Sequence, residues 1–111
     1  MSQIEALEQQ LKDAKELVAR RDLALRLGQN RDFRKLILED FIITEASRLV
    51  AQSADPVLSA KEQQDALNMA QAGGHLKRYL SMMVMMGNSA ESSIPDIEQT
   101  LIEVRNEGDD D

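Results

Sequence analysis

The sequence contains no cysteine and no tryptophan, and its 111 residues include one histidine and one tyrosine. The absence of cysteine excludes a disulfide framework and thiolate metal sites, and it fits a reducing compartment. With one histidine and no cysteine, the chain has little material for a soft-metal site or for nucleophilic catalysis. We therefore predict no catalytic residues, no cofactor, no metal ligands and a protein that is not an enzyme.

Long apolar runs are also missing, and no segment approaches the roughly 18 consecutive apolar residues that a membrane span requires. The N-terminus, MSQIEALEQQLKDAKEL, is charged and amphipathic from its start, whereas a signal peptide has a basic segment followed by an apolar core. We therefore expect no membrane association and a cytoplasmic location.

Basic clusters that would favour nucleic-acid binding are weak. The groups ARR at 19–21, RDFRK at 31–35 and KR at 77–78 are diluted by acids, and no aromatic residues alternate with them to stack on bases. We do not expect nucleic-acid binding, although folding could bring these groups together on a DNA-contacting helix.

Aliphatic residues and methionine supply most of the apolar content, since 42% of the chain is hydrophobic but only 3% is aromatic. This composition suits helices, and apolar residues recur at spacings of three and four without a persistent strand pattern. We predict an all-α fold, a helical hairpin or small helix bundle. Its expected parts are a coiled-coil-like N-terminal helix in residues 1–27, a central hairpin in 28–88, and a short helix with an acidic tail in 89–111.

Heptad spacing marks the N-terminal segment. Its apolar residues form a stripe, the N-terminal seam, that is typical of coiled coils. We predict that this seam makes homo-oligomers and that Gly28 ends the helix in a left-handed conformation. The residues assigned to oligomerisation are Ile4, Leu7, Leu11 and Val18.

The next segment, residues 31–53, is apolar on most sides and is predicted to be the most buried helix, with Asn30 as its cap and Phe41 in its middle. Pro56 then marks a turn. A further helix is expected from Ser59, whose spacing to Glu62 matches a capping box.

Glycines lie within and directly after this further helix, which is expected over residues 60–86. The pair Gly73 and Gly74 either kinks the helix or admits a neighbouring backbone, and we favour close approach. Gly87 is expected to stop the helix. A second capping-box pattern, starting at Ser93, predicts that the short C-terminal helix begins there.

Two features indicate partner binding. Methionines flank Val84 on consecutive helical positions, so at least one must face outward, either as adaptable packing or as a binding surface. Residues 89–111 carry eight acids against one base and supply all of the net charge of −7. This tail is either a solubility aid or a contact for a basic partner. The residues assigned to partner binding are Met82, Met85, Met86, Asp109, Asp110 and Asp111.

Residues 27–87 resemble small uncharacterised helical proteins encoded by tailed bacteriophages. The resemblance lies in RLGQNRDFRKLILEDFIITEASRLV, the acidic proline turn and GGHLKRYLSMMVMMG. It implies a virion-associated or assembly protein that binds other proteins, located in the bacterial host cytoplasm or the phage particle. An inhibitor of a host enzyme and a DNA-packaging or DNA-binding accessory factor are the alternatives. The resemblance supplies no catalytic residues.

Overall fold

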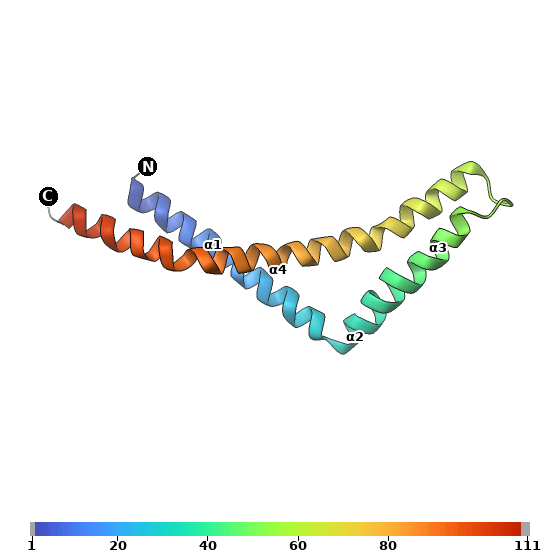
Figure 1. Ribbon diagram of the computed structural model, residues 1–111, viewed down its shortest axis with the longest axis horizontal. Coiled ribbons are helices and arrows are strands. Elements are labelled where there is room, and N and C mark those ends of the chain that lie inside the picture. The colour runs from blue at the N-terminus through green and yellow to red at the C-terminus, as the bar shows by residue number, and fades with distance from the viewer. Residues whose placement is uncertain (1, 110–111) are drawn as a thin grey trace. The chain divides into compact units, whose positions relative to one another are not determined.

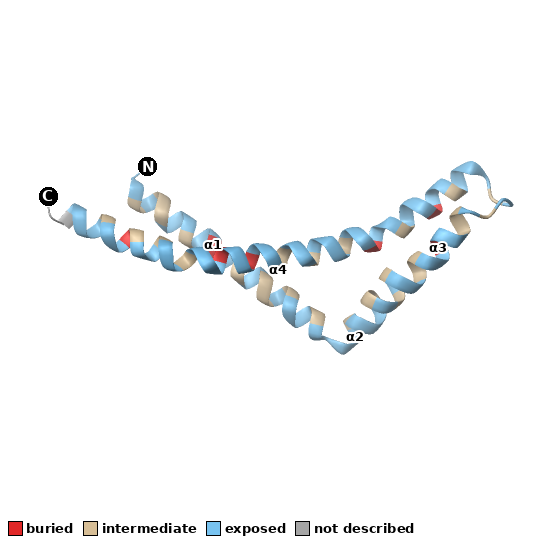
Figure 2. Ribbon diagram, viewed as in Figure 1, coloured by how far each residue is buried: buried red, intermediate tan, exposed pale blue. Residues whose placement is uncertain are grey.

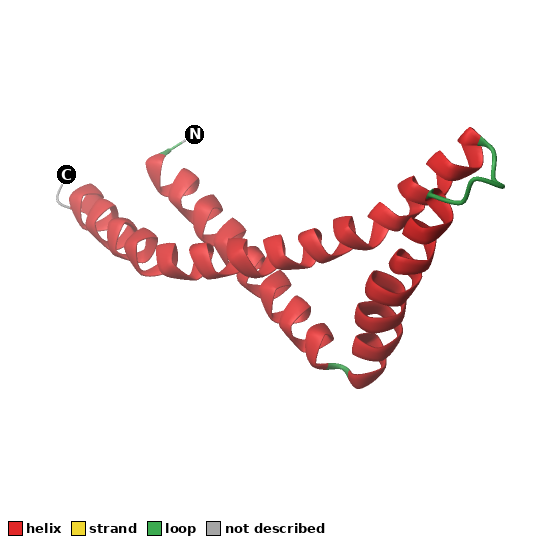
Figure 3. Cartoon of the chain, turned by 45° about the vertical axis from the view of Figure 1, so that its right-hand side comes forward, coloured by secondary structure: helices red, strands yellow, loops and turns green. Residues whose placement is uncertain are grey.

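The computed structural model describes residues 2 to 109, Asp109 by its backbone only, and every regular element in that range is a helix. The all-α prediction is confirmed. Figure 1 shows the order of the elements along the chain, and Figure 3 shows the loops that join them. The elements are α1 (Gln3–Gln29), α2 (Arg31–Phe33), the π-helix η1 (Arg34–Glu45), α3 (Ala46–Ser53) and α4 (Ala60–Asp109).

The chain folds as two compact units. The terminal unit comprises Met1–Leu25 and Met82–Asp111, and therefore pairs most of α1 with the second half of α4. The hairpin unit, Arg26–Ser81, pairs α2, η1 and α3 with the first half of α4. Each unit therefore consists mainly of two helical layers.

Side-chain caps define two of the helix starts. The backbone N–H of Phe33 donates to Asn30 Oδ1 at 2.9 Å, which confirms the predicted cap of the segment beginning at Arg31. The backbone N–H of Glu62 donates to Ser59 Oγ at 3.1 Å at the start of α4. The predicted end at Gly28 is wrong, because α1 continues to Gln29 and no described glycine has a positive φ.

A π-helix occupies the middle of the central segment. Its hydrogen bonds join residues five apart, and the stretch LILEDFII places apolar residues at that spacing, as in Ile37 and Ile42. Lys35 Nζ reaches Glu39 Oε2 at 3.4 Å and Asp40 Oδ1 at 3.2 Å, one turn further along. The bond with Asp40, followed by that with Glu39, raises the pKa of Lys35.

The prediction that this central segment is the most buried helix is wrong. Leu49 is its only buried residue, whereas Phe41 is 38% exposed and Leu36 is 64% exposed. In a hairpin of two helical layers, one neighbouring helix covers one side of the segment. The apolar residues on its flanks therefore remain accessible.

Gly73 lies where the backbone of the other layer of the hairpin unit comes close. A Cβ atom built on Gly73 would lie 3.1 Å from Ile42 Cα, whereas one built on Gly74 would meet nothing within 4 Å. The preferred interpretation, close approach of another backbone, is therefore confirmed for Gly73.

Helix α4 runs through every position where the sequence suggested a break. The expected stop at Gly87 and the separate start at Ser93 are wrong, since both residues lie inside α4, as does Pro95. Ser93 Oγ donates to the carbonyl oxygen of Ser89 at 3.1 Å, a bond that a serine makes within a helix. The predicted C-terminal helix is thus the end of α4.

Few residues are buried, as Figure 2 shows. Three of the five buried hydrophobic residues are alanines, and Gly73 and Gly87 are buried as well, so the helices approach closely but bury little apolar surface. Each unit thus has a thin core with exposed apolar side chains around it. The buried hydrophobic residues are Ala14, Leu49, Ala66, Ala90 and Leu101.

Candidate protein-interaction surface

Polar contacts fix an antiparallel pairing of α1 and α4 within the terminal unit. Arg105 Nη2 donates to Glu8 Oε1 at 2.9 Å, so the start of α1 lies beside the end of α4. Arg21 Nη1 donates to Asn88 Oδ1 at 3.0 Å, so the later part of α1 lies beside the middle of α4.

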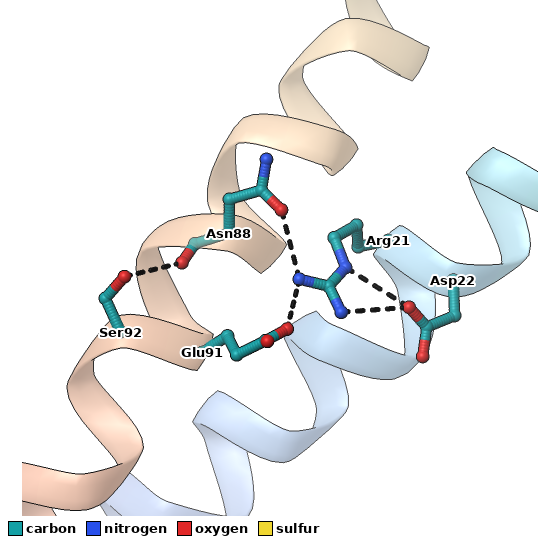
Figure 4. Close-up of polar contacts among 5 residues, drawn as sticks. All are labelled: Arg21, Asp22, Asn88, Glu91 and Ser92. Carbon is teal, nitrogen blue, oxygen red and sulfur yellow. Dashed lines mark hydrogen bonds and ion pairs between the residues drawn. The ribbon is translucent and has the colours of Figure 1, made fainter.

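Arg21 is the centre of the polar cluster drawn in Figure 4. Its Nε and Nη2 atoms donate to Asp22 Oδ1 at 3.2 and 3.1 Å, and its guanidinium also forms an ion pair with Glu91. The bond with Glu91, followed by that with Asp22, raises the pKa of Arg21. A planar guanidinium suits this role because it holds several acceptors in fixed directions.

Gly87 makes room for this cluster. A Cβ atom built on Gly87 would lie 2.9 Å from Arg21 Cγ and nearer still to Arg21 Cβ. Any larger residue at this position would push the helices apart. The absence of a side chain at Gly87 thus serves helix crossing, where the sequence had suggested helix termination.

The N-terminal seam lies within this helix pair. Ile4, Leu7, Leu11 and Val18 are each partly buried, and Ala14, in the middle of the seam, is buried. Leu11 lines a groove together with Leu101 of α4, so the seam packs at least partly within its own chain. Association of several chains through this seam stays a prediction.

Three methionines form an exposed surface on α4. Met82, Met85 and Met86 are 42%, 70% and 40% exposed, while the intervening Met83 and Val84 are partly buried. The expectation that at least one methionine faces outward is confirmed. Spacings of three and four place the exposed residues on one helix face, which we call the methionine surface.

Negative charge is concentrated in the terminal unit. Its sequence contains thirteen acids and five bases, a net charge of −8, whereas the hairpin unit has seven acids and eight bases. Asp109 is the last residue of α4, and the predicted contacts Asp110 and Asp111 lie outside the described residues. Without Asp110 and Asp111 the terminal unit still has eleven acids and five bases, so its excess of negative charge does not depend on the last two residues.

His75 and Tyr79 lie on α4 in the hairpin unit, and both are exposed. Within residues 2 to 109, no three His, Asp or Glu side chains are grouped so that they could hold a metal ion. No helix in the same range is long and apolar enough to cross a membrane.

Comparison of the chain with protein-family models, curated proteins and solved structures gives no match. The resemblance to bacteriophage proteins therefore remains a prediction. The function has to be argued from the exposed surfaces of the two units.

Proposed function

We propose that this protein is a non-enzymatic interaction protein that binds a protein partner through its methionine surface. The observation that carries the proposal is the exposure of Met82, Met85 and Met86 on one face of α4. Three neighbouring apolar side chains on a helix face form a contiguous patch, and such patches mark interaction sites more often than single exposed residues do.

Methionine suits this purpose because its side chain is unbranched, flexible and polarizable, so it adapts to the shape of a partner. The surrounding structure is comparatively fixed, since Arg21 holds α1 against Asn88 and Glu91 of the same helix. When such a surface lies on a helix pair that is already fixed, binding costs less conformational entropy than the ordering of a wholly mobile segment would.

The resemblance to bacteriophage proteins supports assembly of the phage particle as the setting. In this setting the protein is a virion component or an assembly factor, in the host cytoplasm or in the particle. Binding and inhibition of a host enzyme is the alternative use of the same surface. Mass spectrometry of purified particles distinguishes the two, because an assembly component co-purifies with particles or their precursors and an inhibitor stays with its target in the cell extract.

Capture of proteins from host extract, with and without infection, tests the proposal. The variant carries Met85→Gln and Met86→Gln, which keep the chain length of the side chains but add a polar amide. We expect the variant to lose the captured partner while retaining its helical circular dichroism, because both side chains are exposed.

Met69→Gln is the matched control, since Met69 lies on the same helix in the hairpin unit and is 59% exposed. It should leave capture unchanged. Equal capture by the wild type, the control and the double variant would show that the methionine surface does not bind the partner.

A further inference from the structure

The methionine surface continues into a groove along the terminal unit. The groove has a volume of about 670 Å³ and lies between α1 and α4. Ala14 and Ala90 are buried in its floor, while Met86 remains 40% exposed at one end. Its apolar lining residues are Ala14, Leu17, Met86, Ala90 and Ile97.

The charged residues of this groove are all acidic. Asp13 of α1 and Asp96 of α4 line it, and its remaining lining residues are uncharged. Asp13 Oδ1 accepts a hydrogen bond from Gln9 Nε2 at 2.8 Å, which leaves its negative charge in place. Among residues 2 to 109, no base forms an ion pair with Asp13 or Asp96.

Another groove of the same helix pair provides a contrast. It has a volume of about 610 Å³ and is lined by both signs of charge, including Lys12, Lys15, Glu16 and Glu98. The ion pair of Glu8 with Arg105 also lies along it. This second groove, which we call the mixed-charge groove, favours neither a positively nor a negatively charged partner. The first groove, which we call the acidic groove, favours a positively charged one.

We propose that the acidic groove receives an amphipathic helix of the partner, with apolar residues on one face and lysine or arginine beside them. The apolar face would lie on Met86, Ala90 and Leu17, and the basic residues would approach Asp13 and Asp96. This is the groove mode of helix recognition, in which anchors recur at spacings of three and four. The inference rests on the proposed function and specifies the chemistry of the partner.

The dimensions of the groove suit a short helix. Its α4 side runs from Met86 to Ile97. This length is about 16 Å at a rise of about 1.5 Å per residue, or roughly three helical turns. A bound helix of that length presents three or four apolar anchor residues to the groove. The lysine or arginine side chains beside them can extend to the carboxylates of Asp13 and Asp96.

Binding of synthetic peptides tests the inference without knowledge of the natural partner. The probe is an amphipathic peptide of about four turns with leucine at helical spacing and lysine on its flanks. A matched peptide carries glutamate in place of lysine. We expect the lysine peptide to bind the full-length protein in fluorescence anisotropy and the glutamate peptide not to bind.

A charge-matched pair of variants separates groove binding from general attraction to an acidic protein. Asp13→Asn with Asp96→Asn should weaken binding of the lysine peptide about fivefold at low salt, as expected for two exposed ion pairs. Glu16→Gln with Glu98→Gln removes the same charge from the mixed-charge groove and should leave the affinity within about twofold. Equal weakening by both double variants would overturn the inference.

Met86→Gln tests the apolar part of the groove and should weaken the lysine peptide about tenfold, because it removes a thioether from the contact. An unchanged affinity would overturn the inference. Occupation of the groove by a second copy of the chain would also overturn the inference. In that case the Asp13→Asn and Asp96→Asn variant would change the sedimentation of the protein and the peptides would not bind. Loss of peptide binding is measured separately from partner capture, so this inference can fail while the proposed function holds.

Discussion

Gly87 of α4 lies directly against the stem of Arg21 of α1, with only 2.9 Å between a Cβ built on the glycine and Arg21 Cγ. The same arginine then reaches over to Asn88 and Glu91, the residues that follow on α4. Close packing and polar contacts thus coincide at one crossing, and they determine how the methionine surface is held beside α1.

Gly87→Ala is expected to loosen this crossing. The new methyl group overlaps the Arg21 stem, and overpacking of this kind typically costs about 1 to 3 kcal/mol. The gain in helix propensity, about 1 kcal/mol, offsets only part of that cost. We expect lower stability to urea and faster hydrogen exchange in α1. Unchanged exchange in α1 would show that the helices do not approach closely at Gly87.

The glycine pair in the hairpin unit permits a comparison of adjacent positions. Gly74→Ala should stabilise the protein by about 1 kcal/mol, because the added methyl group meets nothing within 4 Å and the helix propensity improves. Gly73→Ala should be less stable than Gly74→Ala by about 1 to 3 kcal/mol, because its methyl group presses on the backbone of Ile42. Urea denaturation measures both. Equal effects would contradict the close approach at Gly73.

Burial predicts which apolar truncation in the central segment costs more. Leu49 is 5% exposed, so Leu49→Ala should cost about 2 to 5 kcal/mol. Phe41 is 38% exposed, so Phe41→Ala should cost only about 1 to 2 kcal/mol, since much of its ring is already in water. Chemical denaturation ranks the two variants. A larger loss for Phe41→Ala would mean that another chain covers the flank of η1.

Local signals in the sequence predicted two of the helix starts correctly. The caps Asn30 and Ser59 act within three residues of their own positions, so nothing distant in the chain is required for them. The turn at Pro56 follows from backbone geometry in the same way, and Val57 N–H donates to Asp55 Oδ1 there at 3.0 Å.

Signals that depend on packing were misread. Gly87 and Ser93 look like a helix end and a new start, but a glycine can also admit a crossing helix and a serine can bond within a helix. The burial of Phe41 was overestimated because a broad apolar stripe does not reveal how many neighbours cover it. The π-helix was missed although Ile37 and Ile42 are five residues apart. The Arg21 cluster gave no signal, since it joins residues far apart in the sequence.

Self-association through the N-terminal seam remains a prediction with its own test. Sedimentation of the full chain at tens of micromolar should show more than a monomer. Leu7→Ser should reduce association, whereas the control Leu36→Ser, at an exposed site of the hairpin unit, should not. A monomer at this concentration, or a stronger effect of the control, would show that the seam does not join chains and serves packing within one chain.

Photo-crosslinking from the methionine surface tests the central claim most directly. A photoreactive amino acid is placed at position 85 in one protein and at position 98, in the mixed-charge groove, in another, and both are irradiated in cells that express the protein. We expect one discrete adduct with a partner protein from position 85 and none from position 98. The same adducts from both positions, or no adduct from position 85, would contradict partner binding through the methionine surface.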